Sequence, residues 1–167
     1  TRGAAATAIK LAFRVTALDN LKPVVRQWQR TSSLHTHVRR VGKEDGSEYR
    51  LQPWYYGWGF NLPRGQALLD KWNQIPDNTD ILVTHCPPLG FLDWVPKKMQ
   101  RVGCMELLNT VQRRVQPKFH VFGHIHEGYG MMTDGTTTFI NASACTVNFM
   151  PMNAPIVFDL PNPRTST

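Results

Sequence analysis

The apolar positions after residue 60 predict strands and helices in alternation, which is the pattern of an α/β protein. Residues 79–84 favour a strand buried on both faces of a parallel sheet, because three apolar residues follow one another there: Ile81, Leu82 and Val83. A second strand is predicted over residues 118–123, which include Phe119, Val121 and Phe122. The length of chain between the two strands suits a right-handed crossover, so we expect them to be parallel.

Two helices are predicted from apolar residues at helical spacing. The first begins near Pro63, a residue suited to a first helical turn, and its apolar stripe is Ala67, Leu68, Leu69 and Trp72. The second lies in the crossover between the strands, and its stripe is Leu107, Leu108, Val111 and Val115. Arg113 and Arg114 are then expected at its exposed carboxyl end, where cations interact favourably with the helix dipole.

The chain after this crossover predicts further strands. Asp134-Gly135 is a strong two-residue hairpin signal, and it separates residues 129–133 from residues 136–142. Residues 155–160 are predicted to form a last strand. Before the first helix, residues 54–60 are rich in aromatic side chains, which we interpret as core or as a pocket wall rather than as a platform for stacked bases.

The formal net charge of +7 is unevenly distributed along the chain. Residues 1–50 hold ten Lys or Arg and four Asp or Glu, a net charge of +6, so the rest of the chain is nearly neutral. Strong basicity can indicate a nucleic-acid partner. Because it is confined to the first third, we interpret it as the mark of a segment of different origin, and nucleic-acid binding is not favoured.

The composition excludes several classes of protein. A hydrophobic content of 41% excludes a disordered chain, and no apolar run approaches the roughly 18 residues that span a bilayer. The three cysteines, an odd number, do not form a disulfide framework. Cys86, Cys104 and Cys145 are interpreted as reduced thiols, which is typical of a cytoplasmic protein.

Histidines follow both predicted parallel strands, at the sheet edge where α/β proteins place their chemistry. Thr84-His85 comes after the first strand, and Gly123-His124-Ile125-His126 comes after the second. If the strands are neighbours, the three imidazoles of His85, His124 and His126 converge on one crevice. Neutral imidazole is a common ligand of zinc-like metals, so the pattern predicts a metal-binding or phosphate-binding site.

Other histidine and cysteine side chains have simpler interpretations. His120 alternates within the second strand and is expected to be structural, and His85 alone could cap a strand. Cys86 lies beside His85, which raises the alternative of a Cys–His nucleophile pair. Adjacent residues at a strand end point apart, so this alternative is not favoured.

The motifs Thr84-His85, followed by Pro87-Pro88, and Gly123-His124-Ile125-His126 resemble the last two motifs of the calcineurin-like metallophosphoesterases. The resemblance is closer to the brain-expressed metallophosphoesterase domain-containing proteins, a branch with phosphodiesterase activity toward cyclic nucleotides. It is carried by residues 58–64, 90–114, 121–130 and 141–147. It covers roughly residues 48–163, which leaves residues 1–47 as a basic, non-family segment and residues 164–167 as a tail.

This resemblance implies a β-sandwich flanked by helices and a dinuclear centre of divalent metals of the Mn, Fe, Zn or Mg class. His85 and His124 would bind one metal and His126 the other, which makes these three histidines the expected metal ligands and catalytic residues. A metal-activated hydroxide would then attack the phosphorus of a phosphodiester or nucleotide substrate, in line with the leaving oxygen.

Three earlier motifs of that family are missing from the chain: an Asp-x-His, a Gly-Asp with the metal-bridging aspartate, and a Gly-Asn-His. The sequence therefore predicts the C-terminal part of the family fold joined to an unrelated N-terminal segment, as alternative splicing or an incomplete gene model would produce. Without a bridging carboxylate, repulsion between two cations leaves at most one metal. We expect either an impaired phosphodiesterase or an inactive remnant that binds one metal weakly or acts as an interaction protein.

Overall fold

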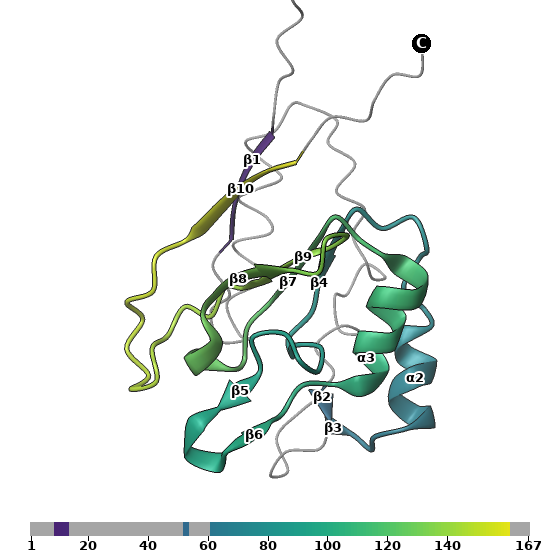
Figure 1. The fold of residues 1–167 in the computed structure, drawn as a ribbon, viewed down its shortest axis with the longest axis horizontal. Helices are drawn as coiled ribbons and strands as arrows, with labels where there is room; N and C mark the ends of the chain where they lie inside the picture. Colours follow the sequence, from purple (N-terminus) through teal and green to yellow (C-terminus); the bar gives the residue numbers. More distant parts are fainter. Residues whose placement is uncertain (1–8, 14–51, 54–60, 161–167) are drawn as a thin grey trace, which may run out of the picture.

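A computed structural model describes residues 9–13, 52–53 and 61–160 of the chain. At its centre is a sheet in the order β4-β7-β9-β8 (Figure 1). Its strands are β4 (Ile81–Val83), β7 (Phe119–Phe122), β9 (Thr138–Asn141) and β8 (Gly130–Thr133). β4, β7 and β9 are mutually parallel neighbours, and β8 pairs antiparallel with β9. The predicted parallel pair is confirmed. The predicted hairpin also forms, but Thr133 pairs with Thr138, so residues 134–137 connect its strands rather than the expected two residues.

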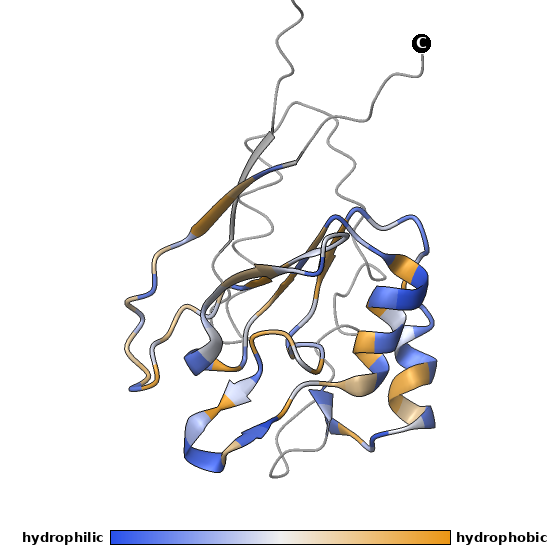
Figure 2. Ribbon diagram, viewed as in Figure 1, coloured by the Kyte–Doolittle hydropathy of each residue, from blue (hydrophilic) through white to orange (hydrophobic). Residues whose placement is uncertain are grey.

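Alternate residues of the parallel strands face two separate cores, because successive side chains in a strand point to opposite faces of the sheet. Leu82, Phe122 and Phe139 pack on one face against the helices α2 (Gln66–Trp72) and α3 (Met105–Thr110). Ile81, Val121 and Ile140 pack on the other face, with Phe158 of β10 (Ile156–Leu160). In Figure 2 the central strands are correspondingly hydrophobic, whereas the helices are hydrophobic on one side only.

The helices follow the predicted stripes with two differences. α2 begins at Gln66, three residues after Pro63, and Ala67 is exposed, so the expectation that Ala67 belongs to the buried stripe is wrong. α3 continues into a π-helical turn over Val111–Val115, and Leu107, Val111 and Val115 are buried as expected. Arg113 is exposed, but the guanidinium of Arg114 donates to the carbonyl oxygens of Trp72 and Ile75. Arg114 therefore satisfies the carboxyl end of α2 as well as lying at the end of its own helix.

The last strand has a partner that the sequence did not predict. β10 pairs antiparallel with β1 (Ile9–Phe13), a strand within the basic N-terminal segment. Because Phe158 lies in the second core, this pair forms a layer on the face of the sheet opposite the helices (Figure 1). Residues 9–13 have no turn signal and no partner nearby in the sequence, so only the folded structure brings them to β10.

Two short strand pairs also belong to the described part of the chain. β2 (Gln52–Pro53) pairs with β3 (Asn61–Leu62), and β5 (Trp94–Val95) pairs with β6 (Gln100–Arg101) around a 3₁₀ turn at Pro96–Lys98. The aromatic stretch 54–60 lies outside the described residues, so its interpretation stays a prediction.

The architecture is mixed α/β, as expected from the sequence. No helix in the described part of the chain has both the length and the apolar character needed to cross a bilayer.

Candidate functional site

The structure brings His85 and His124 together at the carboxyl ends of β4 and β7. Their ring centroids are 4.7 Å apart, with an angle of 65° between the ring planes. The parallel pairing explains this proximity, since Val83 of β4 lies opposite Val121 of β7 and both strands then end at the same sheet edge. The predicted convergence of these two imidazoles is therefore seen in the structure.

His126 lies one residue beyond Ile125, at the start of the 3₁₀ turn η5 (His126–Gly128). Its Nδ1 is 3.1 Å from the carbonyl oxygen of Thr146. A carbonyl oxygen only accepts, so Nδ1 carries a proton, and Nε2 is then the nitrogen with the lone pair in the neutral ring, as in a metal-ligating histidine oriented by a carbonyl. Within the described residues, however, no three His, Cys, Asp or Glu side chains are grouped so as to hold a metal ion. His126 is not grouped with His85 and His124 in this way, and its assignment as a metal ligand stays a prediction.

Both the charge state and the backbone of His124 are unusual. Burial, with a smaller repulsion from His126, lowers the pKa of His124 to about 4, although Glu127 acts in the opposite direction. The ring is therefore neutral at pH 7 and can act as a ligand. The φ angle of His124 is +68°, in the left-handed region that a residue with a side chain seldom adopts.

Asn141 connects the histidine segment to the rest of the fold. It ends β9, the third parallel strand, and its wholly buried Nδ2 donates to the carbonyl oxygens of Ile125, at 2.7 Å, and Leu92, at 3.3 Å. Its Oδ1 accepts from the backbone N–H and the hydroxyl of Ser143. The amide thereby fixes the peptide between His124 and His126. Asn141 was not predicted as a functional residue, although its place at the end of a parallel strand was a usable signal.

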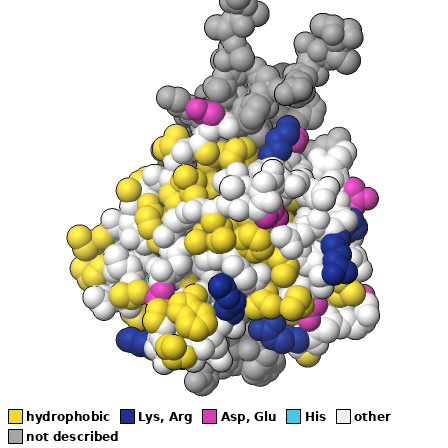
Figure 3. Space-filling model, viewed as in Figure 1, with side chains coloured by type: hydrophobic (Ala, Val, Ile, Leu, Met, Phe, Trp, Pro, Cys, Tyr) yellow, Lys and Arg dark blue, Asp and Glu magenta, His cyan; other side chains and the backbone are white. Residues whose placement is uncertain are grey.

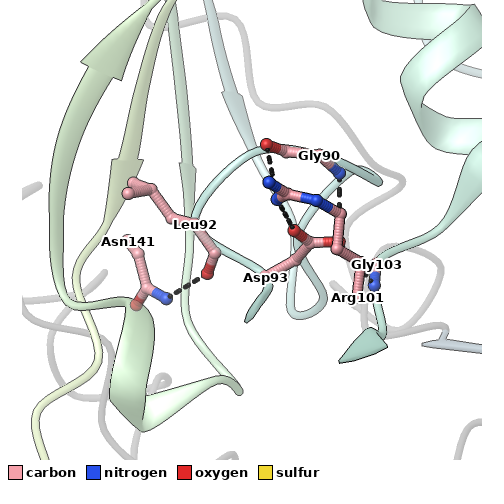
Figure 4. Close-up of polar contacts among 6 residues, drawn as sticks. All are labelled: Gly90, Leu92, Asp93, Arg101, Gly103 and Asn141. Carbon is pink, nitrogen blue, oxygen red and sulfur yellow. Dashed lines mark hydrogen bonds and ion pairs between the residues drawn. The ribbon is translucent and has the colours of Figure 1, made fainter. Parts of the chain in front are cut away.

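A second buried polar group organises the segment that contains Leu92. The carboxylate of Asp93, wholly buried, accepts from the backbone N–H groups of Gly90 and Gly103 at 3.0 Å each. Arg101 donates to the same carboxylate at 2.8 Å and to the carbonyl oxygen of Gly90 at 3.0 Å (Figure 4). Figure 4 also shows Asn141 reaching Leu92, the neighbour of Asp93, so the two polar clusters are joined through one short stretch of backbone.

The approach of this stretch to the histidine segment requires glycine at position 128. A Cβ atom built there would lie 2.0 Å from the carbonyl oxygen of Leu92, well inside van der Waals contact. Gly128 ends the 3₁₀ turn that begins with His126. A side chain at position 128 would therefore push apart the two segments that Asn141 holds together.

His120 is structural, as expected, and its tautomer follows from its partner. It is fully buried, and its Nε2 is 3.0 Å from the hydroxyl of Thr84. That hydroxyl gives its proton to the carbonyl oxygen of Cys86 at 2.8 Å, so Nε2 of His120 must be the donor. Burial lowers the pKa of His120 to about 3, so the ring is neutral throughout the physiological range.

Because His120 stays neutral in the folded protein, the protein should lose stability in mild acid. The pKa of His120 is 6.5 when unperturbed and about 3 in the fold, so between these two pH values the unfolded chain binds this proton and the folded chain does not. The free energy of unfolding should consequently fall as the pH drops from 6.5 toward 3, and His120 alone should account for about 2 kcal/mol at pH 5. Urea unfolding at pH 7.5 and pH 5.0 measures this loss.

The control for this prediction is His120→Phe, which keeps a ring of similar size without a titrating nitrogen. In this variant the loss of stability between pH 7.5 and pH 5.0 should be smaller by about 2 kcal/mol, whatever its stability at pH 7.5. An equal loss in wild type and variant would show that His120 does not govern the acid sensitivity.

The alternative of a Cys–His nucleophile pair gains no support. Cys86 is buried, and its hydrogen bond to Cys104, together with burial, raises the pKa of its thiol well above the ordinary value. A nucleophilic cysteine needs the opposite shift and an accessible sulfur. Cys86 and Cys104 belong instead to the core on the helix side of the sheet.

Imidazole nitrogens are suitable ligands for a divalent metal ion, but two of them are fewer than a catalytic metal site usually has. Two imidazoles whose ring centroids are 4.7 Å apart are suitable ligands, and His126 follows two residues after His124. A catalytic site usually has three protein ligands. The described residues bring two imidazoles together.

Comparison with known proteins identifies relatives at high identity. The chain is 80% identical over 115 residues to Metallophosphoesterase domain-containing protein 1 of Homo sapiens and of Mus musculus, a match that covers 69% of this chain and 35% of each relative. It is 58% identical over 115 residues to a UPF0046 protein of Caenorhabditis elegans, covering 68% of this chain and 29% of that protein. The chain thus spans about a third of the length of these relatives.

Comparisons with protein-family models and with solved structures contribute less to identifying the chain. No protein-family model matches the chain. One solved crystal structure is 22% identical and covers 56% of this chain and 37% of its own, with a TM-score of 0.39, which does not establish a shared fold.

Proposed function

Because the matched 69% of the chain belongs to the metallophosphoesterase domain-containing proteins, we propose that it forms the histidine-bearing part of a metal-dependent phosphodiester hydrolase. The observation that carries the proposal is the pair His85 and His124, 4.7 Å apart between ring centroids at the carboxyl ends of two parallel strands. His126 follows on the same segment with its Nε2 lone pair available.

The finer proposal concerns what this chain does by itself. It binds at most one divalent metal ion, held weakly by His85 and His124, and hydrolyses phosphodiesters such as cyclic nucleotides slowly or not at all. A metal bound there would supply positive charge to phosphoryl oxygens. Two ions at this site would repel each other, because the described residues supply no carboxylate grouped with the histidines to lie between them. The fold is correspondingly proposed to be the C-terminal part of the family's β-sandwich.

The chain's own residues have distinct roles in this proposal. His85 and His124 bind the ion through their imidazoles, and the low pKa of His124, about 4, keeps that ring neutral at pH 7. Asn141 holds the backbone between His124 and His126 in place through the Ile125 carbonyl. It is a positioning residue, since it acts through the segment it holds.

The proposal is tested by titrating Mn²⁺ into the purified chain while measuring binding by calorimetry and turnover of a chromogenic phosphodiester. Wild type should bind one ion per chain, and His124→Ala should weaken binding by about tenfold or more, because one of the two close ligands is lost. His126→Ala should abolish any turnover that is seen. Gln100→Ala, an exposed residue of β6, is the matched control and should change neither quantity.

The outcomes separate the two forms of the proposal. Metal-dependent turnover that disappears in His126→Ala would establish an active phosphodiesterase and contradict the inactive remnant. Binding of one ion without turnover would establish the remnant. Mn²⁺ binding that is equal in wild type, His124→Ala and Gln100→Ala would overturn the histidine site itself.

A further inference from the structure

Residues 143–154 join the end of β9 to β10 and lie against the histidine segment; they are called the rim segment below. At least three side-chain contacts fix the segment. Nδ1 of His126 donates to the carbonyl oxygen of Thr146, and the hydroxyl of Tyr129 donates to that of Ala154 at 2.8 Å. Nδ2 of Asn153 closes its base by donating to the carbonyl oxygens of Ser143 and Cys145 at 2.9 and 3.0 Å.

The tip of the rim segment is a hydrogen-bonded turn. The N–H of Thr146 donates to the carbonyl oxygen of Met150, and the N–H of Phe149 donates to that of Thr146, both at 2.9 Å. This turn holds Phe149 at a φ of +60°, in the left-handed region. A segment tied down at its base, at its tip and to His126 is a preformed surface rather than a loop that is free to move.

The fixed turn presents apolar side chains beside a polar site. Phe149 is 77% exposed, and its ring centroid is 5.2 Å from that of His126, edge-on at 76°. At least half of each neighbouring apolar side chain is also exposed: Val147, Met150 and Met152. Figure 3 shows hydrophobic side chains at the left edge of the molecule, where the connection from β9 to β10 lies in Figure 1.

The rim segment contains no Lys, Arg, Asp or Glu, so it has nothing with which to attract a charged partner. An exposed aromatic ring is a surface for another aromatic or apolar group, and aromatic pairs are worth more than the area they bury. The ring that Phe149 touches belongs to His126, on the same short segment as His124 of the proposed site. A phosphate ester bound at that site would therefore have Phe149 close by as a surface for its organic group.

We propose that the rim segment is the binding surface for the aromatic group of a phosphate ester, with Phe149 as the residue that selects aromatic over small aliphatic esters. The inference rests on the proposed function for the position of the phosphoryl group and names the class of substrate for the same site. Phe149 makes its contribution through binding and takes no part in moving a proton or breaking a bond.

The test compares three probes by calorimetry in the presence of Mn²⁺: phenylphosphonate, methylphosphonate and phenol. Wild type should bind phenylphosphonate about fivefold to tenfold more tightly than methylphosphonate, the range expected for one added aromatic contact. In Phe149→Ala this preference should fall to less than twofold, with the affinity for methylphosphonate unchanged. Val157→Ala, which removes an exposed apolar side chain from β10 outside the rim segment, should keep the full preference.

The outcomes distinguish this inference from the proposed function. Equal affinities for the two phosphonates in wild type would overturn the inference, as would a preference for phenylphosphonate that survives in Phe149→Ala. In either case, the proposed function still stands if the affinities for both phosphonates fall in His124→Ala. Binding of phenylphosphonate and phenol that depends on Phe149, with no binding of methylphosphonate, supports the aromatic surface and contradicts the phosphoryl site. Failure of both aromatic probes to bind overturns the inference, and the diester assay with His126→Ala then decides the proposed function alone.

Discussion

Replacement of Asp93 by alanine should lower the free energy of unfolding by about 3–5 kcal/mol, measured by urea unfolding at pH 7. The carboxylate is wholly buried and is the acceptor for two backbone N–H groups, those of Gly90 and Gly103. Gly103 is itself buried, so its N–H would lose its partner without gaining contact with bulk water. Arg101 is half exposed and can return to solvent, so the cost comes mainly from the backbone donors.

Two further variants test this explanation. In wild type, the N–H groups of Gly90 and Gly103 donate to the same oxygen of Asp93, and Arg101 donates to the other oxygen. In Asp93→Asn the amide oxygen can still accept from both glycines while the amide nitrogen faces Arg101. The free energy of unfolding should therefore fall by only about 1–2 kcal/mol. Asp77→Ala removes a mostly exposed partner of Arg114 and should change the stability by less than about 0.5 kcal/mol. Equal losses for alanine and asparagine at position 93 would contradict the role of the two backbone donors.

Trp72→Ala should lower the free energy of unfolding by about 3–5 kcal/mol, because it empties the largest wholly buried side-chain volume in the described part of the chain. Trp72 belongs to the core between the helices and the sheet, with Leu107, Phe122 and Phe139. Its indole N–H donates to the sulfur of Cys104 at 3.3 Å. Urea unfolding at pH 7 gives the change from the midpoint, provided that the slope is unchanged.

Trp72→Phe separates packing from hydrogen bonding at this position. Phenylalanine keeps most of the ring volume and loses the N–H, so the loss should be about 1–2 kcal/mol. A loss as large as that of Trp72→Ala would mean that the contact with Cys104, rather than the filled volume, dominates. Neither variant should alter the Mn²⁺ affinity of the folded protein, since Trp72 lies on the helix side of the sheet and not at the histidine edge.

The sequence predicted those elements whose evidence is local. The apolar run at Ile81–Val83 and the Asp134-Gly135 turn each specify a strand or a hairpin within a few residues, and both are present. The pairing of β1 with β10 is different, because it joins Ile9 to Leu160 across most of the chain. No local pattern encodes such a partner, so the strand in the basic segment was not foreseen.

The same distinction applies to the site. His85 and His124 were predicted to meet because both follow parallel strands, and strand direction alone brings them to one edge. His126 was also expected at the site, and its Nδ1 contacts the Thr146 carbonyl oxygen, a partner twenty residues away that the sequence did not indicate. Asp93 was missed because backbone donors such as the N–H of Gly103 carry no side-chain signature, whereas the place of Asn141 at the end of a parallel strand was a signal that was not used.

At position 124, the residue that suits the left-handed backbone best is not the residue that a metal site needs. A residue with a side chain at a φ of +68° costs of order 1 kcal/mol that glycine would not. Selection for stability alone would therefore favour glycine at position 124, and selection for ligand binding would favour histidine. Glycine at position 124 would therefore make the polypeptide more stable, but it would remove the imidazole that the proposed metal site needs.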